Sequence, residues 1–176
     1  MSNAQWLQAM AKHDNDDRDF GSEVGGAREL AQQLKARTAE DPLRFAGLAM
    51  QLTPETNEAY PGAILWGFGE ASIPEAAQHA VFDAIRHVMN LGLDDCDRWL
   101  GWAVRHVYDE APLDIVEIVL DRALHAPDPV DNSPVFVRRD DHQPGRDLFQ
   151  HGHNTSRGSL AESLGALLVH APDRPR

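Results

Sequence analysis

The sequence predicts an all-α chain: an α-solenoid of helical hairpins, HEAT-like or TPR-like (tetratricopeptide), with one long irregular loop and a final helix. Three observations support this prediction. Apolar residues recur at helical spacing from about residue 25 to residue 125, capping and breaking residues divide this stretch into segments, and the segments pair at a nearly regular interval.

The first expected hairpin joins a helix over residues 25–39 to a helix over residues 41–52. Asp41 suits the N-cap of the second helix, and Pro42 suits its first position. The two apolar stripes consist of Ala27, Leu30, Ala31 and Leu34 in the first helix and of Phe45, Leu48, Ala49 and Leu52 in the second.

The second hairpin is expected over residues 57–71 and 74–91. Ser72 and Glu75 stand at capping-box spacing around Pro74, and Gly92 suits a C-cap. The inward residues are Ile64, Leu65 and Phe68, followed by Ala77, Val81, Ala84, Ile85 and Val88.

The third hairpin is expected over residues 94–110 and 113–125, with Asp94 as a cap and Pro112 as a break. The three hairpins thus begin near residues 25, 57 and 94. This spacing of about 32 to 37 residues is typical of helical-hairpin repeats. No residue signature recurs at that period, so an irregular helical bundle remains the alternative.

Residues 127–158 form the expected loop, because Pro, Gly, Asn and Asp cluster there. Residues 134–138 could form an isolated strand or an extended crossing. A last helix is expected over residues 159–170, with Leu160, Leu164, Leu167 and Leu168 on one face. This apolar face must be buried against another surface. We expect the helix to fold back onto the third hairpin rather than to bury the face in a dimer. The fragment is expected to be a monomer or a weak dimer.

Residues 1–20 are interpreted as a tag remnant followed by a polar linker, because Met1-Ser2-Asn3-Ala4 resembles a protease scar and several aspartates follow it. Residues 21–176 are then one helical-repeat domain. The segment 171–176 supplies no closing element, so we expect a fragment of a longer chain.

Composition narrows the possible partners. The 176 residues carry 28 acidic and 16 basic side chains, a formal charge of -12, so nucleic acid is an unexpected partner. No apolar run reaches the roughly 18 residues of a membrane span. The only cysteine, Cys96, cannot form an internal disulfide. We therefore expect a cytoplasmic protein without a membrane segment.

Several residue groups could carry chemistry, but each has a simpler interpretation. His79, Asp83 and His87 share one helix face and could ligate a metal, yet a solvated face with ordinary charge pairing is favoured. Gly67-x-Gly69 follows no strand, so it is not a phosphate loop. His142, His151 and His153 lack zinc-site spacing, and Trp66, Trp99 and Trp102 suit packing at helix contacts. We expect no catalytic residue, no cofactor and no metal.

The most individual stretch covers residues 152–162. Its cap-forming residues could present backbone N–H groups to an anion, with Arg157 adding charge. The alternative is that Arg157 pairs with Glu162 or a loop carboxylate and orders the entry into the helix. The candidate binding or structural motif consists of Asn154, Thr155, Arg157, Gly158 and Glu162.

This stretch resembles part of the C-terminal helical-repeat region of large bacterial ATP-binding proteins similar to STAND signalling NTPases, several of which act in antiviral defence. The matching residues are Gly152, Asn154, Thr155, Arg157, Gly158, Ala161 and Glu162, with further matches in residues 10–17, 26–30 and 41–46. The resemblance spans most of residues 10–170. It implies a sensor or scaffold segment that recognises a protein or other domains of the parent chain.

The leading functional hypothesis is therefore a non-catalytic protein-recognition or scaffolding segment of a larger bacterial signalling NTPase. The alternative is a helical domain that binds a small molecule or a metal through residues 127–158.

Overall fold

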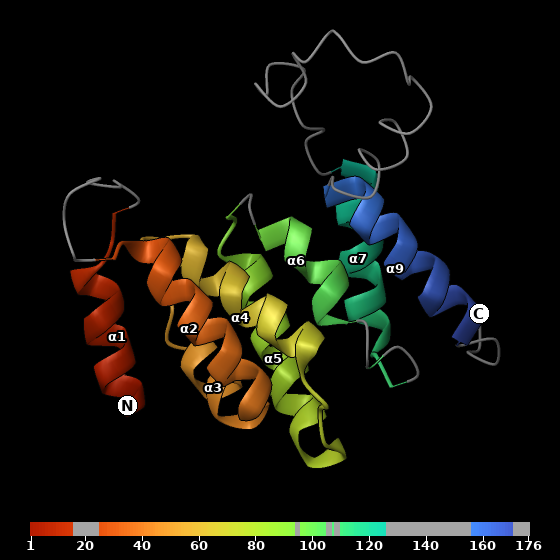
Figure 1. Cartoon of the computed structure of the whole chain (residues 1–176). Coiled ribbons are helices and arrows are strands. Elements are labelled where there is room, and N and C mark those ends of the chain that lie inside the picture. The colour runs from red at the N-terminus through yellow and green to blue at the C-terminus, as the bar shows by residue number, and fades with distance from the viewer. Residues whose placement is uncertain (16–24, 94–95, 105–106, 108–109, 126–155, 171–176) are drawn as a thin grey trace, which may run out of the picture.

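The computed structural model describes residues 1–15, 25–93, 96–104, 107, 110–125 and 156–170. Within these ranges all regular secondary structure is helical, which confirms the all-α prediction (Figure 1). None of the helices described there has the length and apolarity that a membrane span requires. The helices are α1 (Asn3–Lys12), α2 (Ala27–Glu40), α3 (Pro42–Ala49), α4 (Ala59–Glu70), α5 (Glu75–Asn90), α6 (Cys96–Ala103), α7 (Leu113–His125) and α9 (Ser156–His170).

The main helix contacts connect one hairpin to the next. In one row α2 packs on α4, α4 on α6 and α6 on α9, whereas α3 packs on α5 in a second row (Figure 1). α9 also packs on α7. The buried side chains form one continuous cluster that extends from Trp6 to Leu167. The closest helix packing in the described part of the chain is therefore between successive hairpins rather than within them.

The junction between α2 and α3 agrees with the sequence. The Asp41 carboxylate accepts a hydrogen bond from the Arg44 backbone N–H at 3.2 Å, and Pro42 occupies the first helical position. Proline fits there because the first backbone N–H groups of a helix have no partner within it. The second helix nevertheless ends at Ala49, three residues earlier than expected.

The start of α5 differs from the expectation. Pro74 occupies the N-cap position, and no side chain forms a capping hydrogen bond there. The capping box expected from Ser72 and Glu75 is therefore not formed. Proline instead fixes the backbone before the first turn, with φ at -64°. The other end agrees with the sequence, because Gly92 follows the helix with φ at +72°, a conformation that favours glycine.

The first residues require a correction. Residues 1–20 were expected to lie outside the fold, yet Asn3–Lys12 form α1, capped by reciprocal hydrogen bonds between Ser2 and Gln5. Trp6 and Met10 are 4% exposed, and the Trp6 ring meets Phe45 edge-on at 5.9 Å. This helix was missed because the first residues were interpreted as a tag remnant and because its partner Phe45 lies far along the chain.

Asp14 and its neighbours connect α1 to the rest of the fold through backbone carbonyls. The Tyr60 hydroxyl donates to His13 at 2.5 Å, the Asn57 amide donates to Asp14 at 3.2 Å, and the backbone N–H of Ala27 donates to Asn15 at 2.9 Å. These hydrogen bonds hold residues 13–15, which were predicted to be a solvated linker, against α2 and α4.

Two glycines in α4 allow this helix to approach α2 and α6 closely. A Cβ atom added to Gly67 would lie 2.5 Å from the Thr38 Cβ in α2. A Cβ atom on Gly69 would lie 2.4 Å from the backbone oxygen of Trp102 in α6. Gly67 and Gly69 thus lie within α4 and leave room for the neighbouring helices. They belong to a helix and not to a phosphate-binding loop.

The C-terminal part confirms one expectation about packing. α9 folds back onto α6 and α7, the helices of the third hairpin, and buries Leu160 and Leu167 there, with Leu164 partly buried. It begins at Ser156, three residues earlier than expected. The predicted cap Asp94 and the expected loop from residue 127 up to residue 155, including the possible strand at 134–138, lie outside the described residues.

Candidate functional site

The candidate motif near residue 157 belongs to a helix–helix junction. Arg157 and Gly158 lie in the first turn of α9, and Glu162 is exposed one turn later. The Arg157 guanidinium donates a hydrogen bond to the backbone oxygen of Leu124, near the C-terminus of α7. A cation is favourable at that end of a helix. The junction therefore supports the structural interpretation, with a backbone carbonyl as a partner that the sequence did not indicate.

The structure does not describe every residue of the candidate motif, but it does describe Ser159 beside it. Asn154 and Thr155 lie outside the described residues, as do His142, His151 and His153. Ser159 is buried, and its hydroxyl donates to the backbone oxygen of Arg98 in α6 at 3.4 Å. The start of α9 is thus joined to both helices of the third hairpin.

The histidine face of α5 shows ordinary pairing. His79 lies 3.7 Å from the Asp83 carboxylate, and Arg86 donates to Asp83 at 2.8 Å. The His87 ring lies within hydrogen-bond distance, 2.9 Å, of the Leu52 backbone oxygen. Among the described residues, no group of three or more His, Cys, Asp or Glu side chains is arranged to hold a metal ion.

Arg86 also connects α5 to α7. Its guanidinium donates to both carboxylate oxygens of Asp114, at 2.5 and 2.9 Å. These hydrogen bonds lower the pKa of Asp114 below its ordinary value of 3.8 and raise the pKa of Arg86. Both pKa values of this pair shift in the direction that favours the charged forms, and the pair joins two helices of successive hairpins.

This contact predicts a pH dependence of stability. Because the pKa of Asp114 is lower in the folded state than in the unfolded state, the contribution is complete above pH 3.8 and is lost as the pH falls through the folded value. Asp114→Asn should cost less than about 1 kcal/mol at neutral pH, since the carboxylate is 51% exposed. Urea titrations of both proteins should show this difference disappearing in acid. Glu117→Gln is the control, and a difference that persists in acid would contradict the assignment.

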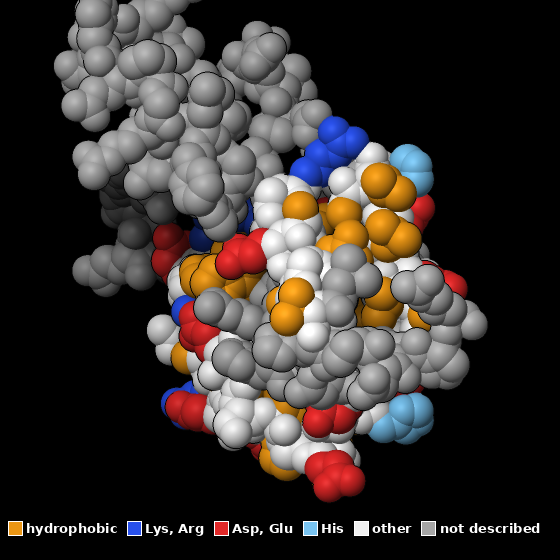
Figure 2. Space-filling view, turned by 90° about the vertical axis from the view of Figure 1, so that its right-hand side faces the viewer, with side chains coloured by type: hydrophobic (Ala, Val, Ile, Leu, Met, Phe, Trp, Pro, Cys, Tyr) orange, Lys and Arg blue, Asp and Glu red, His pale blue; other side chains and the backbone are white. Residues whose placement is uncertain are grey.

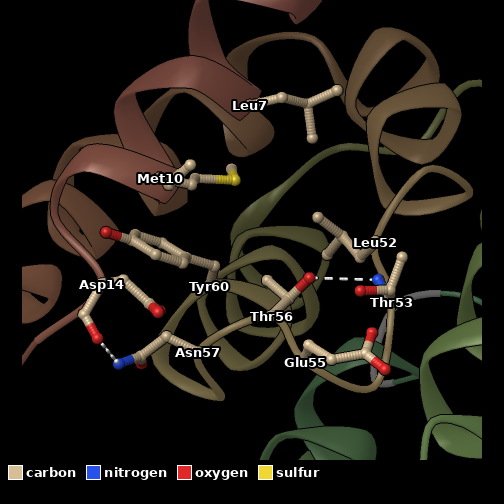
Figure 3. Close-up of a pocket in the computed structure, with 10 residues that line it drawn as sticks. Leu7, Met10, Asp14, Leu52, Thr53, Glu55, Thr56, Asn57 and Tyr60 are labelled. Carbon is tan, nitrogen blue, oxygen red and sulfur yellow. Dashed lines mark hydrogen bonds between the residues drawn. The ribbon is translucent and has the colours of Figure 1, made fainter.

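Two hollows merit comparison as binding sites. The first, between α1 and the α3–α4 loop, has an apolar side formed by Leu7 and Met10 and a polar side that includes Asp14 and Glu55 (Figure 3). A hydrogen bond from Thr53 lowers the pKa of Glu55. The volume of about 230 Å³ is below the roughly 300–1,000 Å³ of typical ligand sites. We interpret this hollow as the seam where α1 docks.

The second hollow is a groove over α4, between α2 and α6, with a volume of about 330 Å³. We call it the tryptophan groove. The rings of Trp66 and Trp99 stack in it with centroids 4.2 Å apart and planes 9° from parallel. It is lined by Arg28, Ala31, Gln32, Glu58, Ala59, Ala63, Trp66, Arg98 and Trp99.

Cationic side chains border this aromatic pair. The Lys35 ammonium lies 4.1 Å from the Trp66 ring centroid, and the Arg98 guanidinium carbon lies 5.2 Å from that of Trp99. Such distances allow cation–π attraction. The sequence predicted that Trp66, Trp99 and Trp102 pack at helix contacts. The stacked pair agrees with this prediction for Trp66 and Trp99, whereas Trp102 is 38% exposed. The grouping with Lys35 and Arg98 depends on three helices coming together.

A third surface feature is an apolar patch on the outer side of α7 and α9. Leu113, Leu120 and Leu124 of α7 and Val169 of α9 are each more than 40% exposed. Figure 2 shows hydrophobic side chains gathered on this face. Such patches often mark interaction surfaces. The tryptophan groove differs from it in combining aromatic rings with cations in a hollow, so we regard the groove as the better defined candidate site.

Searches against known protein families, curated proteins and solved structures found no match to this chain.

Proposed function

We propose that this chain is an α-solenoid segment that recognises a protein, or other domains of its own parent chain, within a larger bacterial signalling NTPase. In this proposal the segment performs no catalysis itself. Its role is to provide a rigid surface for the partner. Binding of the partner to this surface is transmitted along the helical array to the rest of the parent protein.

The solenoid part of the proposal is supported by how the hairpins follow one another. They begin at Ala27, Ala59 and Cys96, so the intervals are 32 and 37 residues. The first helix of each hairpin packs on the first helix of the next, and α9 continues that row by packing on α6. In repeat proteins each unit buries its apolar face against its neighbour, which is the pattern of contact described here.

The recognition part is supported above all by the tryptophan groove. Tryptophan and arginine are enriched among the residues that dominate protein interfaces. In this chain the two stacked indoles are only partly buried, and Arg98 beside them is exposed. A pre-formed aromatic surface needs little reordering when a partner binds, which lowers the entropic cost of association.

The connection to a signalling NTPase comes from the resemblance of residues 152–162 and of the shorter stretches in residues 10–46. The sequence contains no Gly-Lys-Ser/Thr motif, so a nucleotide would have to bind elsewhere in the parent protein. The proposed division of labour is therefore recognition in this segment and nucleotide chemistry in another.

The central test is identification of a partner. The tagged chain is crosslinked in a bacterial host, with an unrelated acidic helical protein as control, and captured proteins are then purified and titrated against it. We expect at least one protein, or one separately expressed domain of the parent, to bind with a Kd of about 10 µM or lower, an affinity usual for specific recognition. Absence of any reproducible purified complex would contradict the proposal.

A second prediction concerns nucleotides and metals. Because no phosphate loop is present, MgATP should give no measurable heat in calorimetry at micromolar protein, and no hydrolysis. Thermal shift assays with MgATP, Zn²⁺ and Ca²⁺ should leave Tm unchanged, since only a ligand that prefers the folded state raises it. A rise in Tm with a micromolar Kd would instead favour a small-molecule or metal-binding domain.

A further inference from the structure

The shape of the tryptophan groove is set by small residues beside the two indole rings. Ala31 on α2 and Ala59 and Ala63 on α4 are small, which leaves the hollow beside the larger rings. Gly62 maintains the position of Trp99, because a Cβ atom at Gly62 would lie 3.0 Å from that ring. The space is large enough for one or two side chains of an incoming segment, and too small for a folded domain.

The indoles in the groove are held before any partner arrives. Trp66 is contributed by α4 and Trp99 by α6, and the two helices pack directly on each other. Lys35 is positioned over Trp66 partly by Glu70, whose carboxylate lies 3.0 Å from the ammonium. The two rings are thus held by contacts within the chain, and an apolar side chain could pack against the parts of them that remain exposed.

The charge of the groove differs from that of the chain. Arg28 and Arg98 line it with one carboxylate, Glu58, whereas the whole sequence has a formal charge of -12. A guanidinium presents a planar set of donors that matches a carboxylate with two hydrogen bonds. The acidic surroundings repel extended polyanions, so a nucleic acid is a poor match, while a single carboxylate can reach the exposed Arg98.

We propose that the tryptophan groove binds a short protein segment in which an aromatic or large aliphatic side chain is flanked by Asp or Glu. The apolar anchor packs against the Trp66–Trp99 pair over the alanine floor, and the neighbouring carboxylate pairs with Arg98 at the rim. This inference rests on the proposed function, because it specifies the class of partner that the recognition surface accepts.

The test begins with a displayed library of random twelve-residue peptides selected on the intact chain. We expect the selected peptides to be enriched in Phe, Tyr, Trp or Leu next to an acidic residue. One selected peptide is then synthesised and titrated by following indole fluorescence, alongside variants in which Lys replaces its acids and Ala replaces its anchor. Both variants should bind at least about tenfold more weakly, the equivalent of one charge-assisted hydrogen bond or one buried side chain.

Charge reversal on the protein locates the site. Arg98→Glu removes an exposed guanidinium and should weaken binding of the synthetic peptide about tenfold or more. The matched control is Arg37→Glu on α2, which reverses an exposed arginine outside the groove and should change Kd less than about twofold. Circular dichroism checks that both variants are folded, and Trp66→Phe provides a second, uncharged probe of the aromatic surface.

The possible results of these experiments distinguish a failure of the groove assignment from a failure of the proposed recognition function. Basic or unselective peptides, equal binding by Arg98→Glu and Arg37→Glu, or no selected peptide at all would overturn the assignment of the groove. Binding of a twelve-nucleotide single-stranded DNA that is lost in Arg98→Glu would also overturn it, in favour of a nucleic-acid surface. If a purified natural partner binds but is insensitive to Arg98→Glu, this inference fails while the proposed recognition function stands.

Discussion

Replacing Trp6 with alanine is expected to lower the free energy of unfolding by about 3 kcal/mol, at the lower end of the range for large aromatic residues in a core. Trp6 is 4% exposed and meets Phe45 of α3. α1 is held mainly by side chains such as Trp6 and Met10 and by the hydrogen bond from Arg44 to Asn3 at 3.0 Å. Loss of the indole should therefore release the helix as well as leave a cavity.

Gln8→Ala is the matched control, because Gln8 is exposed on the same helix and alanine favours helix formation. Its free energy of unfolding should change by less than about 0.5 kcal/mol. Urea denaturation gives both values, and hydrogen exchange of the α1 amides reports whether that helix opens by itself. Equal stability of the Trp6 variant and the wild type would mean that α1 does not contribute to the fold in solution.

Gly69→Ala is expected to destabilise the chain by about 3 kcal/mol, although alanine is the better helix former. The added Cβ would lie 2.4 Å from the backbone oxygen of Trp102 and 2.7 Å from its carbonyl carbon. Backbone cannot change rotamer to relieve such a contact, so α4 and α6 must move apart. Since α6 also supports α9, the displacement should extend toward the third hairpin.

Gly47→Ala provides a control with the opposite sign. Gly47 lies within α3, and no atom would lie within 4 Å of an added Cβ. Alanine should therefore stabilise the chain by about 0.5–1 kcal/mol through helix propensity and lower unfolded-state entropy. Denaturation midpoints of the two variants should move in opposite directions from wild type, and movement in the same direction would contradict close packing at Gly69.

Only part of the candidate site could be predicted from the sequence. Trp66 and Trp99 could be assigned to packed helix faces from their neighbours, and the stacked rings agree with that assignment. The chain order gave no indication that Lys35 would lie over Trp66, since the two residues belong to different hairpins. Arg157 shows the same limit, because one of its partners is the backbone oxygen of Leu124, which no pairing of side-chain charges could indicate.

Local signals in the sequence determined the helical class, the Asp41-Pro42 junction and the glycine that ends α5, because periodicity, capping and backbone preference act within a few residues. Tertiary structure decided that α1 belongs to the fold, that Gly67 and Gly69 face neighbouring helices, and which tryptophans meet. These features depend on contacts between residues far apart in the chain. Their energy comes from burial and close packing, which a local pattern can permit but cannot assign to a particular partner.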